Sequence, residues 1–96
     1  MSESTVPEND VMNDEEVRAL RATPPEIIVG NHAFHLMELA AIYLSSESPQ
    51  LDEARLAIDA VSGMLNSLGD RLGDSGSLLH EGLAQIQMAY VRVSSS

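Results

Sequence analysis

The sequence predicts an all-α protein: a small antiparallel three-helix bundle that dimerises and carries a disordered acidic N-terminal arm. Large apolar residues recur at alternating spacings of three and four in three segments, which is the repeat of an α-helix. No segment shows the alternation typical of a strand, and turns rich in Ser, Pro or Gly separate the three segments. The length of 96 residues limits the chain to one domain.

The N-terminal arm is expected to cover residues 1–24. It holds six acidic side chains and two arginines, with only scattered large apolar residues. Such a composition buries too little apolar surface to offset the entropy lost on ordering. Residues 15–22 allow a short turn, which must end before Thr23-Pro24-Pro25 because a proline restricts the backbone of the residue before it. The helical domain is therefore expected to cover residues 25–96.

The first helix of the bundle is predicted at residues 26–45, and Pro25 suits the first position of a helix. It carries two apolar seams. One contains Ile27, Gly30, Phe34, Met37, Ala41 and Leu44, and the other contains Val29, Ala33, Leu36, Ala40 and Tyr43. Only a narrow stripe around Asn31, His35, Glu38 and Ser45 is polar. This helix is expected to be buried on most sides.

The second and third helices are predicted at residues 51–68 and 76–93. The second keeps a strict three-four spacing of apolar residues, namely Leu51, Ala54, Ile58, Val61, Leu65, Leu68 and Leu72. Glycines and polar residues at 69–77 then indicate a turn. The third helix has its seam at Leu79, Leu83, Ile86, Tyr90 and Val93. Short connections place consecutive helices side by side in opposite directions.

The predicted dimer follows from the surplus of apolar surface on the first helix, which two neighbouring helices cannot cover. We expect Phe34, Leu36, Ala40 and Tyr43 to form most of the interface. A fold of roughly 70 residues also rarely reaches more than about 3–5 kcal/mol without a partner, a metal or a disulfide. The alternative is a monomer in which residues 15–22 fold back as a fourth helix and cover the second stripe with Val17 and Leu20.

The charge of the chain argues against nucleic acid as a direct ligand. The formal net charge is −10, from fifteen acidic residues and five Arg or Lys. All five are arginines and they are scattered singly, whereas phosphate binding needs clustered cations. We expect a protein interaction module instead, with a basic partner such as a ribosomal protein steered by the acidic arm. A purely structural homodimer that uses the same apolar surface is the alternative.

Cysteine is absent from the sequence, so disulfides, thiolate metal sites and thiol catalysis are excluded. The N-terminus also lacks the basic start and apolar run of a signal peptide. The most apolar stretch, residues 33–44, contains His35 and Glu38 and is too short to span a bilayer. We therefore expect a cytoplasmic protein without membrane contact.

One cluster of chemically capable residues is found at His32, His35 and Glu38, which follow one another at a helical spacing of three. All three residue types bind divalent metals, and His80 is a further candidate from the third helix. The order differs from the Glu-x-x-His and His-Glu-x-x-His patterns of known metal helices. We expect a non-enzyme without a cofactor, in which these residues form a polar edge; a His/Glu metal-binding protein is the alternative.

Several stretches resemble one uncharacterised bacterial family. They are Pro24-Pro25-Glu26-Ile27-Ile28, His35-Leu36-Met37, Leu51-Asp52-Glu53-Ala54-Arg55 with Ile58-Asp59, and Glu81-Gly82-Leu83-Ala84-Gln85-Ile86-Gln87-Met88-Ala89-Tyr90. The chain is similar to domain-of-unknown-function family 1844, in its actinobacterial branch, over residues 24–93. The resemblance implies a short cytoplasmic helical protein without an assigned activity, and genes of the branch near that of translation initiation factor three suggest a translation-linked role. Glu38 departs from the branch, where small apolar residues are common.

Overall fold

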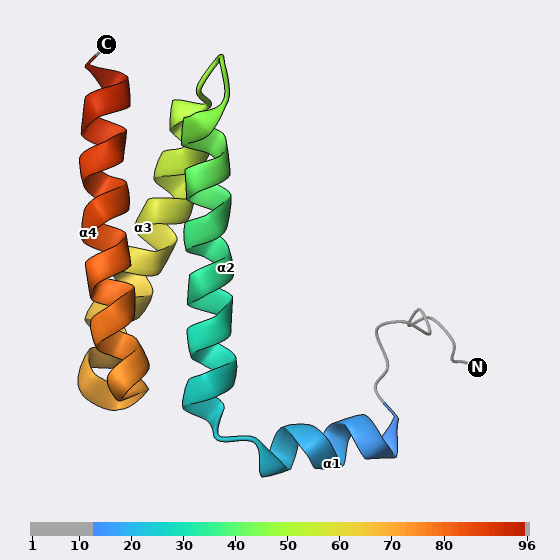
Figure 1. Ribbon diagram of the computed structural model, residues 1–96. Helices are drawn as coiled ribbons and strands as arrows, with labels where there is room; N and C mark the ends of the chain where they lie inside the picture. The colour runs from blue at the N-terminus through green and yellow to red at the C-terminus, as the bar shows by residue number, and fades with distance from the viewer. Residues whose placement is uncertain (1–12, 96) are drawn as a thin grey trace.

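The computed structural model describes residues 13–95, and these residues form helices connected by short turns without a strand. The elements are α1 (Asp14–Ala22), α2 (Pro25–Ser45), α3 (Leu51–Leu68), the 3-10 turn η2 (Gly69–Leu72) and α4 (Asp74–Ser94). Helices α2, α3 and α4 form an up-down-up bundle, and α1 projects from its base (Figure 1). The all-α class and the three predicted helices of the bundle are confirmed, with ends that differ by one or two residues.

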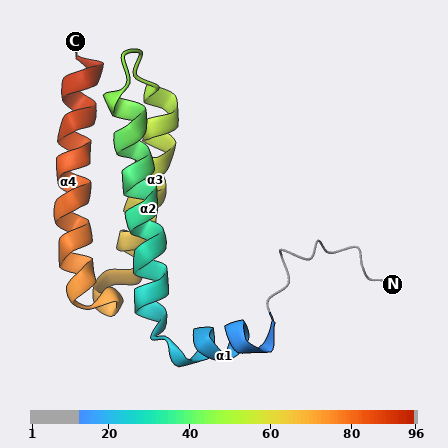
Figure 2. The ribbon, with the colours of Figure 1, turned by 45° about the vertical axis from the view of Figure 1, so that its right-hand side comes forward.

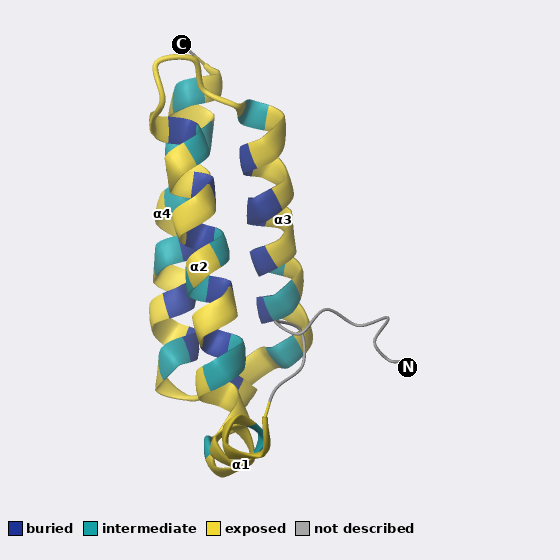
Figure 3. Cartoon of the chain, turned by 90° about the vertical axis from the view of Figure 1, so that its right-hand side faces the viewer, coloured by how far each residue is buried: buried dark blue, intermediate teal, exposed yellow. Residues whose placement is uncertain are grey.

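The core lies along the axis of the bundle, where the inner faces of α2, α3 and α4 meet. In Figure 3 the buried residues of α3 follow one edge of that helix, which faces the other two. Val61, Leu65 and Leu79 are the largest fully buried side chains. The core of the described residues is entirely apolar. Apolar burial is therefore the main force that holds the bundle together.

The buried stripe of α2 runs between the two seams predicted from the sequence. Gly30, Met37 and Leu44 come from one seam, and Ala33 and Ala40 come from the other. A helix face about 100° wide is enough to contact two neighbouring helices. The residues of both seams that lie outside this face therefore stay partly or fully exposed. Ile27, for example, is 49% exposed. Within this single chain α2 is therefore buried on one side, and its burial on most sides stays a prediction for an assembly with a partner.

The connections between the helices depend on local hydrogen bonds and on glycine. The backbone N–H of Gln50 donates to the carbonyl oxygen of Tyr43 at 3.0 Å and closes the turn after α2. After α3, Gly69 and Gly73 have φ values of 60° and 65°, a left-handed region that suits glycine best. Arg71 lies between them, and its guanidinium donates to the last carbonyls of α3. These interactions bring α4 back along the bundle.

Helix α1 corrects the prediction for the N-terminal arm. Residues 14–22 form a regular helix, with a capping box in which the side chain of Asn13 accepts from the N–H of Glu16 at 2.8 Å. The side chain of Glu16 in turn accepts from the N–H of Asn13 at 3.0 Å. The predicted arm of residues 1–24 is thus partly helical; residues 1–12 lie outside the described residues.

The alternative fold with a fourth helix packed on the bundle is not what the structure contains. Helix α1 lies beside the base of α2 and extends away from the bundle (Figure 2). Contacts join α2, α3, η2 and α4 with one another, and α1 packs on none of them. No residue of α1 is buried, and Leu20 is 41% exposed. The second stripe of α2 therefore remains without the cover that Val17 and Leu20 were expected to give.

Helix α2 is the one helix in the described part of the chain that is long and apolar enough to cross a membrane. Its 21 residues include a window with a mean hydropathy of 1.3. The sequence argument considered only residues 33–44 and so underestimated this length. In the folded chain, α2 is the central helix of the bundle and packs against both α3 and α4. Core helices of bundles pass the same test of length and composition, and 28% of this window is buried inside the chain.

Candidate interaction surface

The outward face of α2 is an apolar surface on which no other helix packs. Ile42 is 63% exposed and Leu39 is 38% exposed, and the half-buried Ile28 lies on the same side of the helix. His32 and His35 lie between them and are exposed. Residues 28, 32, 35, 39 and 42 alternate in steps of four and three, so they form one continuous line, which we call the outer seam.

The outer seam differs from the interface that the sequence predicted. Phe34 and Leu36 are half-buried and pack against the core of the same chain. Ala40 is only 1% exposed and is part of that core, so it offers no surface to a partner in this fold. Tyr43 is half-buried. Phe34 and Leu36 thus line the edges of the contact between α2 and its own neighbours, and Ala40 lies inside it.

The outer seam was not recognised in the sequence because His35 was counted with the polar stripe. Asn31 and Glu38, the other members of that stripe beside His35, flank the outer seam. The signal that would have identified it is the three-four spacing of Ile28, Leu39 and Ile42 with the histidines, which repeats the pattern of the two seams already counted. A third seam on one helix cannot face the same core as the other two. It therefore marks the side that faces away.

The candidate metal ligands do not converge. His32, His35 and Glu38 are all exposed on α2. Among the described residues, no group of three or more His, Cys, Asp or Glu side chains is placed to hold a metal ion. His80 lies on α4 near the turn, beside Gly73 and Gly76. The metal-binding alternative thus has no support from geometry.

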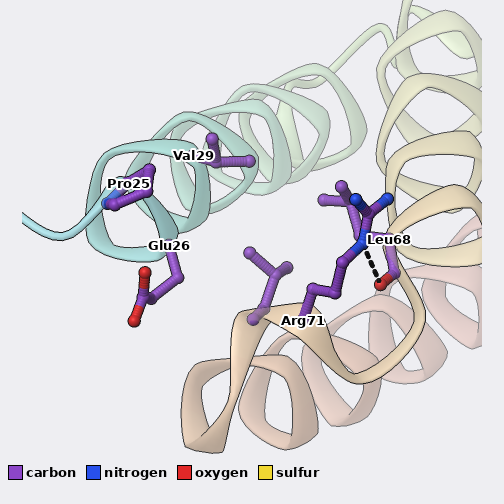
Figure 4. Close-up of a pocket in the computed structure, with 6 residues that line it drawn as sticks. Pro25, Glu26, Val29, Leu68 and Arg71 are labelled. Atoms are coloured by element: carbon purple, nitrogen blue, oxygen red, sulfur yellow. Dashed lines mark hydrogen bonds between the residues drawn. The ribbon is translucent and has the colours of Figure 1, made fainter.

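A small depression at the base of the bundle lies between the start of α2 and the turn after α3 (Figure 4). Its volume is about 210 Å³, and it is lined by Pro25, Glu26, Val29, Leu68, Arg71 and Leu72. Ligand pockets usually measure about 300–1,000 Å³. The Nε of Arg71 donates to the carbonyl oxygen of Leu68 at 3.2 Å, as the dashed line shows. The cation of this depression therefore caps α3.

A larger groove of about 380 Å³ follows the contact between α2 and α4 near their C-terminal ends. It is lined by Ala41, Leu44, Ser45, Gln85, Ile86, Ala89, Arg92 and Val93. These residues include no carboxylate, imidazole or thiol, which are the groups that carry most acid-base and nucleophilic catalysis. The groove is an apolar surface between two helices and resembles a docking surface more than a reaction site.

The comparisons with known proteins give no relative from which a role could be transferred. A scan against models of protein families finds no match. Searches of curated proteins and of solved structures find no significant match either. The resemblance to family 1844 stays a prediction, and the function must be argued from the surface alone.

Proposed function

We propose that this chain is a non-enzymatic protein interaction module that acts in the cytoplasm. The observation that supports this most strongly is the undocked helix α1, which is regular and capped but packs on no other helix. No residue of α1 is buried: Leu20 is exposed and Val17 is only half-buried. Amphipathic helices of this kind commonly bind by laying their apolar side on another protein.

The proposed partner is a basic protein, because the chain itself is strongly acidic. The net charge of −10 gives a field that attracts cations and accelerates their encounter with the protein. Charges of this kind are screened over about 8 Å at physiological ionic strength, so binding should weaken as salt is added. The resemblance to family 1844 supports a translation-linked role, in which a ribosomal protein is the basic partner.

Affinity purification from cells at low and high salt tests this proposal. We expect a basic protein to be recovered at low salt and lost at high salt. A variant with Glu3→Gln, Glu8→Gln and Asp10→Asn should lose it at both salt concentrations. The control variant, Asp74→Asn with Glu81→Gln, removes charge from α4 and should retain the partner. Recovery of no partner from any of the samples would contradict the proposal.

A further inference from the structure

We propose that the outer seam of α2 binds a second copy of this chain, with the two α2 helices antiparallel and centred on His35. A second copy of the chain is thus one partner of the proposed interaction module. The dimer rests on the proposed function only in that the outer seam of α2 is used as a binding surface. The seam is formed by Ile28, His32, His35, Leu39 and Ile42, of which Ile42 is 63% exposed.

The spacing of the outer seam is self-complementary in this orientation. A two-fold axis at His35 places Ile28 opposite Ile42 of the second copy. His32 comes level with Glu38, one residue from the level of Leu39. Apolar ends thus meet apolar ends, as an isologous contact requires. The two His35 rings meet at the centre, where one neutral imidazole can donate a hydrogen bond to the other. A single polar pair within an apolar seam is a known way to fix the register of paired helices.

The distribution of charge favours this face over the exposed face of α3 for self-association. Residues 27–45 contain a single formally charged side chain, Glu38, in a chain of net charge −10. The antiparallel register places Glu38 level with His32 of the second copy, so the two carboxylates do not oppose each other. The exposed face of α3 carries Asp52, Glu53 and Asp59, and only Arg55 offsets them. Two copies that met through α3 would therefore repel each other.

Helix α1 is placed to complete the contact. In Figure 3, which looks toward α2 from outside the bundle, α1 is seen end-on below it, so α1 projects on the same side as the outer seam. Pro25 and Ser45 are each ten residues from His35, which is about 15 Å along the helix. The antiparallel register therefore brings residues 46–50 of the second copy level with α1.

The end of α1 nearest α2 is complementary in charge to this segment. It carries Arg18 and Arg21, whereas Asp14, Glu15 and Glu16 lie in the first turn at the far end of α1, and residues 46–50 carry Glu47. The length of α1 is about 13 Å, enough to cross the 10–12 Å diameter of a helix. One face of α2, about 31 Å long, falls short of the roughly 800 Å² that each partner contributes to a standard interface. The added contact of α1 compensates for this deficit.

Two substitutions test whether the outer seam is the interface. Ile42→Glu places a charge in the seam, and Leu56→Glu is the matched control on α3, where the leucine is 74% exposed. Both side chains face solvent in the monomer, so circular dichroism should show unchanged helix content. By light scattering we expect about twice the chain mass of 10.3 kDa for the native chain and the control. Ile42→Glu should weaken the dimer at least ~30-fold, as loss of a hot-spot residue does.

The absence of cysteine allows a test of the register. In the antiparallel dimer, two copies of residue 28 are about 21 Å apart, far beyond the ~4.4–6.8 Å between the Cα atoms of a disulfide. Ile28→Cys and Ile42→Cys should therefore each remain uncrosslinked alone and form a disulfide-linked dimer when mixed. A parallel dimer would give the opposite result and overturn the register.

The contribution of α1 is tested by charge reversal. Arg18→Glu together with Arg21→Glu should weaken the dimer by about threefold or more, as expected for exposed ion pairs, and Glu47→Arg added to them should restore it. A native chain that stays at 10.3 kDa up to high micromolar concentration would overturn the dimer. If that monomer still bound a basic partner in a salt-dependent way, the proposed function would survive the failure of the dimer.

Discussion

Gly63 lies in the middle of α3, where a glycine lowers the stability of the helix without serving a visible structural need. It is exposed, and a Cβ atom built on it meets nothing within 4 Å. Its φ is not positive, so alanine fits the same backbone. Glycine in a helix interior is less favourable than alanine by about 0.5–1 kcal/mol. Gly63→Ala should therefore raise the free energy of unfolding by about that amount.

The gain should be easy to measure because the bundle is small. For a domain of 60–100 residues, 1 kcal/mol corresponds to a change in Tm of about 4–8 °C. We expect thermal unfolding followed by circular dichroism to show a rise of about 2–8 °C for Gly63→Ala. Urea unfolding should show a higher midpoint with an unchanged slope.

Gly82 on α4 provides the matched comparison. A Cβ there comes within 3.0 Å of Cε and 3.4 Å of Sδ of Met37. The end of the methionine must shift by a few tenths of an ångström, and that displacement offsets part of the gain in helix propensity. Gly82→Ala should therefore stabilise less than Gly63→Ala. An equal rise for both variants, or no rise for Gly63→Ala, would refute this reasoning.

Three further predictions concern the core, α1 and the outer seam. Leu79→Ala removes a fully buried side chain at a cost of about 2–5 kcal/mol, so unfolding should begin near room temperature. Asn13→Ala breaks the capping box and should slightly lower the helix content seen by far-ultraviolet circular dichroism. Added to the monomeric variant Ile42→Glu, it should leave the Tm unchanged because α1 packs on no other helix. In the proposed dimer, His35 faces its own copy, with His32 and Glu38 on both copies nearby. Sedimentation should therefore show dissociation for His35→Asp, which sets two carboxylates against each other at the two-fold axis.

The three helices of the bundle were predictable because their cores follow the helical repeat and their ends carry strong signals. Pro25 opens α2, and Gly69 and Gly73 mark the turn between α3 and α4. Helix α1 was missed because its composition is acidic and it buries nothing, although the spacing of Asn13 and Glu16 is that of a capping box. Composition indicates whether apolar burial can offset the entropy that a segment loses on ordering. It does not detect a short helix that is stabilised by a capping box at its own end.

The candidate surface was harder to predict, since three apolar seams share one helix. Periodicity identifies which residues lie on a common seam of a helix. It does not tell which of several apolar seams faces the neighbouring helices. Ala40 illustrates the ambiguity: its spacing fits a dimer interface, yet packing against α3 and α4 encloses it. Small residues such as Ala33 and Ala40 allow the neighbouring helices to approach closely, and Met37 and Leu44 fill the space between them on the inward face of α2. The bulky Leu39 and Ile42 are thereby left outside.

This division of α2 explains why one helix can serve both the fold and a partner. Close approach of α3 and α4 on the side of Ala33 and Ala40 is governed by steric fit, and it does not require the large side chains of the opposite side. Ile42→Glu should accordingly change the oligomeric state without unfolding the bundle. Ala40→Glu would place a charge among buried apolar residues and should unfold it. Circular dichroism of the two variants separates the roles: similar helix content in both would mean that the inward and outward faces of α2 have been assigned incorrectly.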